Sequence, residues 1–484
     1  MLGLTAGRLK TFTLIMLITL SLILSGSLWF EDYHGFSAFF ARIGDMTFSR
    51  IINIGKDGFQ SKYEKIFSPS EIIINDGDGG HWILYPSEQV SDEVWKTAKT
   101  LLKDIAATAK GLNSNVVEKQ EWDGLLTKRS VLVSFGYPLN EDIVSILIKA
   151  DDNKINEAAV NISEMSIIRL GENVILYTKK KRNNKDVYQK FYFSNSQFFS
   201  DKYLEQIFND DRLIRYHSLK EALPDAGPDL TFNDRVIAPI TSHSNQRKKT
   251  VSLKKVDFVP EITIDEGEEI DNLVNKFFQG ADYAKFIKND GTHIFIDERN
   301  NTLKIYSDGM VEFELREDSI LNREDAGFES ALRTTLTTTE KYGGIGSLYL
   351  TGMSIEKGEY VFQFNYTVEG IPVVCSRMNE NPPVNGAVEV MIGNGLIRYK
   401  RLLSEPKALE EEYRFLSNHD SISIINSIVE NVGSNKSNIH IEDIRLVYRV
   451  AEGGGTTLYP VWLVKYQVDG RKAWKTIDAA KDRS

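Results

Sequence analysis

Side chains that could do acid–base or metal chemistry lie scattered along this chain of 484 residues. It has seven histidines, and no two of them have the spacing of zinc ligands. A Gly-x-Ser-x-Gly elbow, a Ser-x-x-Lys motif and a phosphate-binding loop are all missing from the sequence. The sequence therefore predicts no enzyme, no cofactor and no metal site.

The one motif that imitates a metal loop is Asp76-x-Asp78-x-Gly80. A calcium loop of this type needs a bidentate Glu at its twelfth position, and Ser87 stands there. The glycines between two apolar runs instead favour a tight hairpin turn. We interpret the motif as structural.

Two further features have ordinary structural explanations. Cys375 follows an apolar run and is typical of a small buried side chain rather than a nucleophile. The acidic run 410–412 is typical of an exposed helix face, because a glycosidase pair needs two carboxylates facing each other across a cleft.

The amino-acid composition indicates the cellular compartment of the protein and excludes one class of partner. Cys375 is the only cysteine, so no disulfide can form within the chain. This fits a bacterial surface protein better than a secreted eukaryotic one. The net charge of -10 argues against nucleic acid as a main partner.

One segment is typical of a membrane span. Residues 11–30 carry no charge, and a helix of that length would be ~30 Å long, the thickness of a bilayer's hydrocarbon core. Arg8 and Lys10 precede the run, whereas Glu31 and Asp32 follow it. Positive flanks stay in the cytoplasm, so we expect a single-pass protein of the cell membrane with residues 31–484 outside.

A cleaved signal peptide is the alternative, because Ser25-Gly26-Ser27 could be a cleavage site. Retention is favoured by the length of the apolar run and by Trp29 and Phe30, which stand where an interfacial aromatic anchor belongs.

A retained helix has two faces that could contact a partner helix. Small and hydroxylated residues let transmembrane helices pack closely. Ser21 and Ser25 form one such pair, and Thr19 and Gly26 lie seven residues apart on another face. Lipid-facing helices also tolerate these residues, so both interpretations stay open.

Hydrophobic periodicity divides the remainder into α+β units. Helices are expected at 91–110, 201–208, 268–278, 323–342 and 422–432, with alternating strands of antiparallel sheets between them. From residue 265 onward, a pattern of one helix followed by strands occurs three times. The predicted organisation comprises a cytoplasmic tail (1–10), a transmembrane helix (11–30), a stalk (31–67), an N-terminal α+β ectodomain (68–235), a central helix-plus-sheet domain (236–320) and C-terminal helix-plus-sheet units (321–484).

Four blocks, in order, resemble the YycH family. They are WILYPSEQVSDEVWKTAKTLL (82–102), DGTHIFIDERNNTLKIYSDGMVEFE (290–314), the strands within 361–402, and IRLVYRV followed by LYPVWLVKY (444–466). Residues 459–479 also look like a PepSY-type strand pair, a module of inhibitory proteins. The turn at 297–300 departs from the family's usual pattern.

The resemblance implies a non-enzymatic, membrane-anchored regulator of Gram-positive bacteria. Members of the family act with a single-pass partner, YycI, to restrain the cell-wall sensor kinase WalK (YycG) of a two-component system. A different class of function stays open, namely an anchored envelope enzyme or a ligand-binding protein whose site assembles from distant residues.

Overall fold

The computed structural model describes residues 64–479 with internal gaps, and these residues belong to one unit of the fold. Within residues 64–479 its gaps are 86–88, 108–113, 150–154, 183–184, 194–198, 210–212, 214, 224–228, 234, 240–249, 261–266, 308, 316–326, 347, 375–385, 394–395, 417–420, 433–437 and 451–456. The predicted transmembrane helix and its residues Thr19, Ser21, Ser25 and Gly26 lie outside the described residues. No helix in the described part is both long and apolar enough to cross a bilayer.

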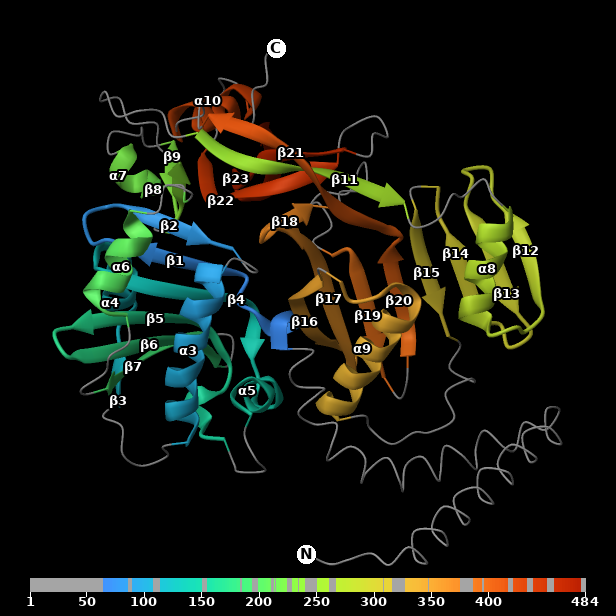
Figure 1. Cartoon of the computed structure of the whole chain (residues 1–484), viewed down its shortest axis with the longest axis horizontal. Helices are drawn as coiled ribbons and strands as arrows, with labels where there is room; N and C mark the ends of the chain where they lie inside the picture. Colours follow the sequence, from blue (N-terminus) through green and yellow to red (C-terminus); the bar gives the residue numbers. More distant parts are fainter. Residues whose placement is uncertain are drawn as a thin grey trace, which may run out of the picture. The chain divides into compact units, whose positions relative to one another are not determined.

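The first part of the unit is built on a sheet of nine described strands, in the order β10-β8-β2-β1-β4-β5-β6-β7-β3 (Figure 1). All its pairings are antiparallel. The strands are β1 (Glu71–Asn75), β2 (His81–Leu84), β3 (Ser114–Val117), β4 (Ser130–Leu139), β5 (Ile162–Leu170), β6 (Asn173–Arg182), β7 (Lys185–Phe193), β8 (Arg215–Ser218) and β10 (Ile237–Pro239).

Helices cover both faces of this sheet. On one face, Trp95 of α3 (Gln89–Ala107) packs edge-on against Phe135 of β4, with ring centroids 5.5 Å apart. Side chains alternate between faces along a strand. The other face therefore takes Asn75 and Ser130, and the segment of α4 (Lys119–Asp123) and η2 (Gly124–Thr127) lies against it. The shorter elements are η1 (Glu64–Phe67), α5 (Glu141–Ile148), η3 (Glu157–Ala159), α6 (Asp201–Phe208) and α7 (Leu219–Ala222).

The second part is a larger sheet of fifteen described strands with three helices (Figure 1). Its strands are β9 (Leu230–Phe232), β11 (Thr250–Pro260), β12 (Tyr283–Ile287), β13 (His293–Asp297), β14 (Thr302–Ile305), β15 (Met310–Glu314), β16 (Leu348–Glu356), β17 (Glu359–Val368), β18 (Ile371–Val374), β19 (Val388–Ile392), β20 (Leu396–Leu402), β21 (Ser404–Leu416), β22 (Ile439–Val450), β23 (Thr457–Val468) and β24 (Arg471–Asp478). The helices are α8 (Gly267–Phe278), α9 (Phe328–Gly343) and α10 (Ser421–Val432).

An aromatic cluster joins α8 and α9 to this sheet. Phe277 of α8 stacks on Tyr342 of α9 with ring centroids 4.1 Å apart, and it also contacts Phe313 of β15. Tyr342 contacts Tyr399 of β20 at 5.4 Å. Large rings gain from both burial and edge or stacked geometry. The cluster therefore fixes both helices on β15 and β20 of the sheet.

The expected α+β class is confirmed, and each of α8, α9 and α10 precedes a set of strands, as the repeat predicts. The predicted helix 201–208 has the observed bounds of α6, and 422–432 differs from α10 by one residue. β14 and β15 pair antiparallel across Gly309, and β23 and β24 across Gly470, as short turns require. Two short pairings are parallel, β18 with β22 and β9 with β22.

The prediction of a helix at 410–412 is wrong. These residues lie in β21, which pairs along its length with β11. Acidic side chains favour helix only weakly, and pairing with a distant strand overrides such a propensity. Residues 221–256 contain Pro224, Gly227, Pro228 and Pro239, which are typical of loops, and β9, β10 and the beginning of β11 nevertheless lie there.

Arg401 of β20 is fully buried and closes the end of α9. Its Nη1 donates to the carbonyl of Gly344 at 2.7 Å, and its Nη2 donates to that of Gly343 at 2.6 Å. The last carbonyls of a helix lack partners within the helix, and a cation there also suits the helix dipole. A Cβ at Gly343 would lie 2.4 Å from the guanidinium carbon, so glycine is required at that position.

We predict that Arg401→Met lowers the free energy of unfolding by about 3 kcal/mol, because the carbonyls of Gly343 and Gly344 lose the donors that a fully buried guanidinium supplies. Urea denaturation of the variant and the wild type measures the difference. The matched control is Arg398→Met on the same strand, which removes a partly exposed ion pair with Glu389 and should cost less than about 1 kcal/mol. Equal losses in the two variants would contradict the capping role.

Candidate functional site

Three buried polar residues lie side by side across the N-terminal sheet. Asn75 of β1 is the register partner of both His81 of β2 and Ser130 of β4. Register partners point to the same face of a sheet. The three side chains therefore form a polar row on one face of the sheet, and each is at most 2% exposed.

A chain of hydrogen bonds fixes the orientation of every group in this row. Ser130 Oγ donates to the carbonyl of Leu125 in η2 at 2.9 Å, and Asn75 Nδ2 donates to Ser130 Oγ at 2.8 Å. The amide oxygen of Asn75 is therefore the atom that faces His81 Nδ1, at 2.6 Å. An amide oxygen only accepts, so Nδ1 carries the proton and Nε2 is left as an acceptor.

The environment keeps His81 neutral. Burial lowers its pKa from 6.5 to about 4. Asp76 acts in the opposite direction, while His217 and Arg215 lower the pKa further. The ring is therefore uncharged at neutral pH, with a lone pair on Nε2.

A cavity of about 500 Å³ lies beside His81. The α4–η2 segment forms one wall, and the end of β8 with α7 forms another. Its lining residues are His81, Lys119, Gln120, Asp123, Gly124, Leu126, Thr127, Ser218, Lys220 and Glu221. We call this cavity the His81 pocket.

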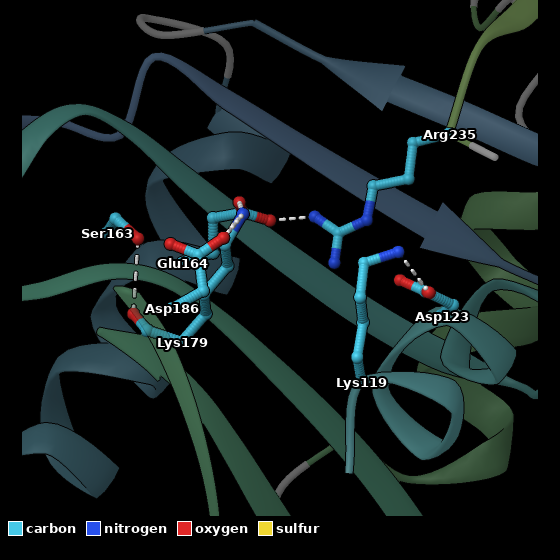
Figure 2. A network of polar contacts seen from close by, with 7 residues as sticks. All are labelled: Lys119, Asp123, Ser163, Glu164, Lys179, Asp186 and Arg235. Atoms are coloured by element: carbon cyan, nitrogen blue, oxygen red, sulfur yellow. Dashed lines mark hydrogen bonds and ion pairs between the residues drawn. The ribbon is translucent and has the colours of Figure 1, made fainter. Parts of the chain in front are cut away.

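A network of ion pairs lies beside α4 (Figure 2). Arg235 pairs with Glu164 of β5, and its guanidinium lies 4.9 Å from the ring centre of Trp122 in α4. Burial lowers the pKa of Arg235 to about 10, so it keeps its charge at neutral pH. Within α4, Lys119 and Asp123 form an ion pair at 2.8 Å.

Lys179 extends this network along the sheet (Figure 2). Its Nζ lies 2.9 Å from Glu164 Oε1 and 3.4 Å from Asp186 Oδ2, and Ser163 Oγ donates to its backbone carbonyl. The run 179–182 lies at the end of the β6–β7 hairpin. Lys179 is nevertheless mostly buried and paired, which charge patterning alone does not indicate.

The Asp76 loop is a hairpin turn, as the sequence predicts. Asp76 Oδ1 accepts from the backbone N–H groups of Asp78 and Gly80 at 2.7 and 2.8 Å. Its other oxygen pairs with Arg215 of β8 at 3.1 Å. A Cβ at Gly80 would lie within 2.6 Å of the side chains of both Asp76 and Arg215, so glycine leaves room for this ion pair. The ion pair in turn fixes β2 beside β8.

The site residues of the structure differ from those that the sequence singles out. Thr19, Ser21, Ser25 and Gly26 lie outside the described residues, so their role stays a prediction. In the described residues no group of three or more His, Cys, Asp or Glu side chains could hold a metal ion. The row of Asn75, His81 and Ser130 was not predicted, because only strand register brings these residues together. A polar residue at the end of each of three apolar strands is the signal that could have indicated it.

Comparison with known proteins identifies the fold of this chain. No family model matches the chain, and no curated protein matches its sequence. The crystal structure of YycH from Bacillus subtilis is similar with a TM-score of 0.51 and 14% identity, covering 87% of this chain and 97% of that one. The chain has a YycH-like fold. The resemblance to the YycH family that the sequence indicates is therefore confirmed at the level of the fold.

Two other solved structures are similar over smaller parts of the chain. A protein of uncharacterized function from Eubacterium rectale has a TM-score of 0.33 and 15% identity over 53% of this chain and 90% of its own. The C-terminal domain of YpeB from Bacillus megaterium has a TM-score of 0.23 and 11% identity over 45% and 93%. Neither likeness is strong enough to carry an argument about this chain.

We predict that His81 makes stability depend on pH in the acid range. Its pKa in the folded state, about 4, is below the unfolded value of 6.5, so the unfolded chain takes up the proton first as the pH falls. The contribution of the neutral ring to the free energy of unfolding is therefore complete above pH 6.5. This contribution is lost as the pH falls from 6.5 to 4, and the total loss is about 3 kcal/mol.

Urea denaturation across this pH range measures the slope. His81→Gln, which can still donate to Asn75 Oδ1, should flatten it, whereas His440→Gln on β22 should leave it as in the wild type. An unchanged slope in His81→Gln would contradict a neutral buried ring.

Proposed function

We propose that the chain is a membrane-anchored, extracytoplasmic regulator that restrains a cell-wall-sensing two-component histidine kinase by protein–protein contact. The observation that carries the proposal is the YycH-like fold over 87% of the chain, together with four sequence blocks in the family's order. The partners proposed on this basis are a WalK (YycG)-like kinase and a YycI-like single-pass protein. The last helix-plus-sheet unit is proposed to be PepSY-like, which suits restraint by binding.

The proposed localisation is the cell membrane of a Gram-positive bacterium, with the N-terminus in the cytoplasm. The charge difference across residues 11–30 supports this orientation. Regulation by contact requires a complementary surface and an anchor and does not require a nucleophile, so we propose that the protein is not an enzyme.

The membrane helix is the part of the chain that we propose for much of the kinase contact. Two proteins anchored in one membrane meet at a high effective concentration, so even weak helix packing has an effect. Lipid is as apolar as leucine, and close approach at small residues therefore decides which helices associate. Ser21 and Ser25 offer such a surface, and Thr19 and Gly26 offer a second.

We predict that bulk added at the small residues weakens the complex. Ser21→Leu with Ser25→Leu should reduce co-purification of the kinase from membranes, because the larger side chains keep the helices apart. The matched control is Leu20→Phe with Leu24→Phe, which enlarges positions that are already large and should have the smaller effect. Circular dichroism should show the same fold in all three proteins.

Two results would contradict different parts of the proposal. If a poly-leucine span in place of residues 11–30 leaves kinase restraint intact, the helix is only an anchor and the contact lies in residues 31–484. If the wild-type chain co-purifies with no histidine kinase, the regulatory function itself is wrong.

A further inference from the structure

The polar row in the N-terminal sheet ends in an atom without a partner. His81 Nε2 is buried and has no hydrogen-bond partner, although His81 Nδ1, Asn75 and Ser130 are all bonded. A buried acceptor left without a donor costs about 1–3 kcal/mol, and such atoms are rare in folded proteins. His81 is 2% exposed and lines the His81 pocket, so we infer that an occupant of the pocket supplies the donor to Nε2.

The acceptor character of Nε2 restricts what that occupant can be. The bonds from Ser130 through Asn75 hold the ring in the tautomer with its proton on Nδ1. Nε2 can therefore only accept, and its partner must present an O–H or N–H group. An anion with no proton to donate would place its own lone pairs against that of Nε2.

The charges around the pocket cancel. Lys119 and Lys220 contribute two positive charges, and Asp123 and Glu221 contribute two negative ones. Lys119 is already paired with Asp123 at 2.8 Å. A pocket of zero formal charge gives neither a cation nor an anion a net electrostatic advantage, and a charged ligand would still lose its hydration.

The remaining lining supplies further polar contacts and an apolar surface. The hydroxyl of Ser218 does not cap α7, which begins at the next residue. Glu221 brings a carboxylate and Gln120 an amide, while Leu126 and Gly124 form an apolar part. Pockets of this kind, with a few fixed polar groups in a concave space of several hundred Å³, are typical of small-molecule sites.

We propose that the His81 pocket binds a neutral, hydroxyl-bearing small molecule, such as a sugar or another polyol, that donates a hydrogen bond to His81 Nε2. The row from Ser130 to His81 positions the acceptor. The carboxylates of Asp123 and Glu221 and the hydroxyl of Ser218 bind the remaining hydroxyl groups of the ligand. This proposal does not depend on the kinase contact, because every residue that carries it belongs to the N-terminal sheet and its covering segments.

Saturation-transfer NMR on the purified full chain tests the proposal with three matched probes. Glucose is neutral, protonated glucosamine adds a positive charge, and glucuronate adds a negative one. At about 10 mM of each probe, a concentration that detects weak binding, glucose should receive the strongest saturation. The pH is kept where His81 is neutral.

Three variants locate the binding. His81→Leu removes the acceptor and should weaken glucose binding at least about tenfold, the usual effect of losing one buried hydrogen bond. Gly124→Leu adds a side chain in the pocket wall, where a Cβ meets no atom within 4 Å and the backbone is helical, and it should have a similar effect. His217→Leu is the control, because His217 lies between Tyr216 and Ser218 of β8 and so points to the opposite face.

Each outcome of these experiments either supports or overturns the proposed ligand site. Binding of glucose that is lost in His81→Leu and Gly124→Leu but kept in His217→Leu supports the proposal. If no probe receives saturation from the protein, water alone occupies the pocket. If either charged probe binds more strongly than glucose, the charge of the ligand controls binding to the pocket. Both results overturn the proposal. If His81→Leu does not fold, Gly124→Leu alone decides.

Discussion

The hydrogen-bond row of Ser130, Asn75 and His81 is the constraint on which the N-terminal part of the structure depends. Three buried polar side chains are tolerable only when they hydrogen-bond one another, and here the bonds through Ser130 Oγ, Asn75 and His81 Nδ1 form only in one register of β4, β1 and β2. A slip of one residue would turn each of them to the opposite face and place apolar side chains in the row. The same row reaches η2 through the carbonyl of Leu125, so it also fixes the segment that forms a wall of the His81 pocket.

Two kinds of polar interaction therefore hold the α4–η2 segment against the sheet. From η2 the contact is a neutral hydrogen bond to Ser130, and from α4 it is the stacking of Arg235 on Trp122 together with the Arg235–Glu164 pair. The pocket lies beside this fixed segment. If the N-terminal sheet binds a small molecule here, and if residues 11–30 form a membrane helix that contacts a kinase, the chain joins a ligand site to a regulatory contact in one polypeptide.

The sequence predicts local elements well and tertiary relations poorly. The predicted helix 201–208 has the observed bounds of α6 because its signals are local, and in the structure Ser200 caps its first turn. The helix expected at 410–412 is a strand, because pairing with β11, more than 140 residues away, decides the conformation. His81 shows the same limit for the site. The sequence shows that residue 81 is a histidine and predicts that it lies in a strand. Its hydrogen bond to Asn75 and its Nε2 atom without a partner depend on strand register, which the sequence alone does not determine.

Restraint of a kinase by contact within the membrane is the central claim, and reconstitution tests it most directly. A WalK-type kinase is placed in proteoliposomes with or without the full-length chain, and the rate of kinase autophosphorylation is measured with ATP supplied to the catalytic domain. The account predicts that the rate falls by about tenfold when the chain is present in excess, the size of a typical coupling between two sites. An unchanged rate at the same excess, with both proteins in the same vesicles, would contradict it.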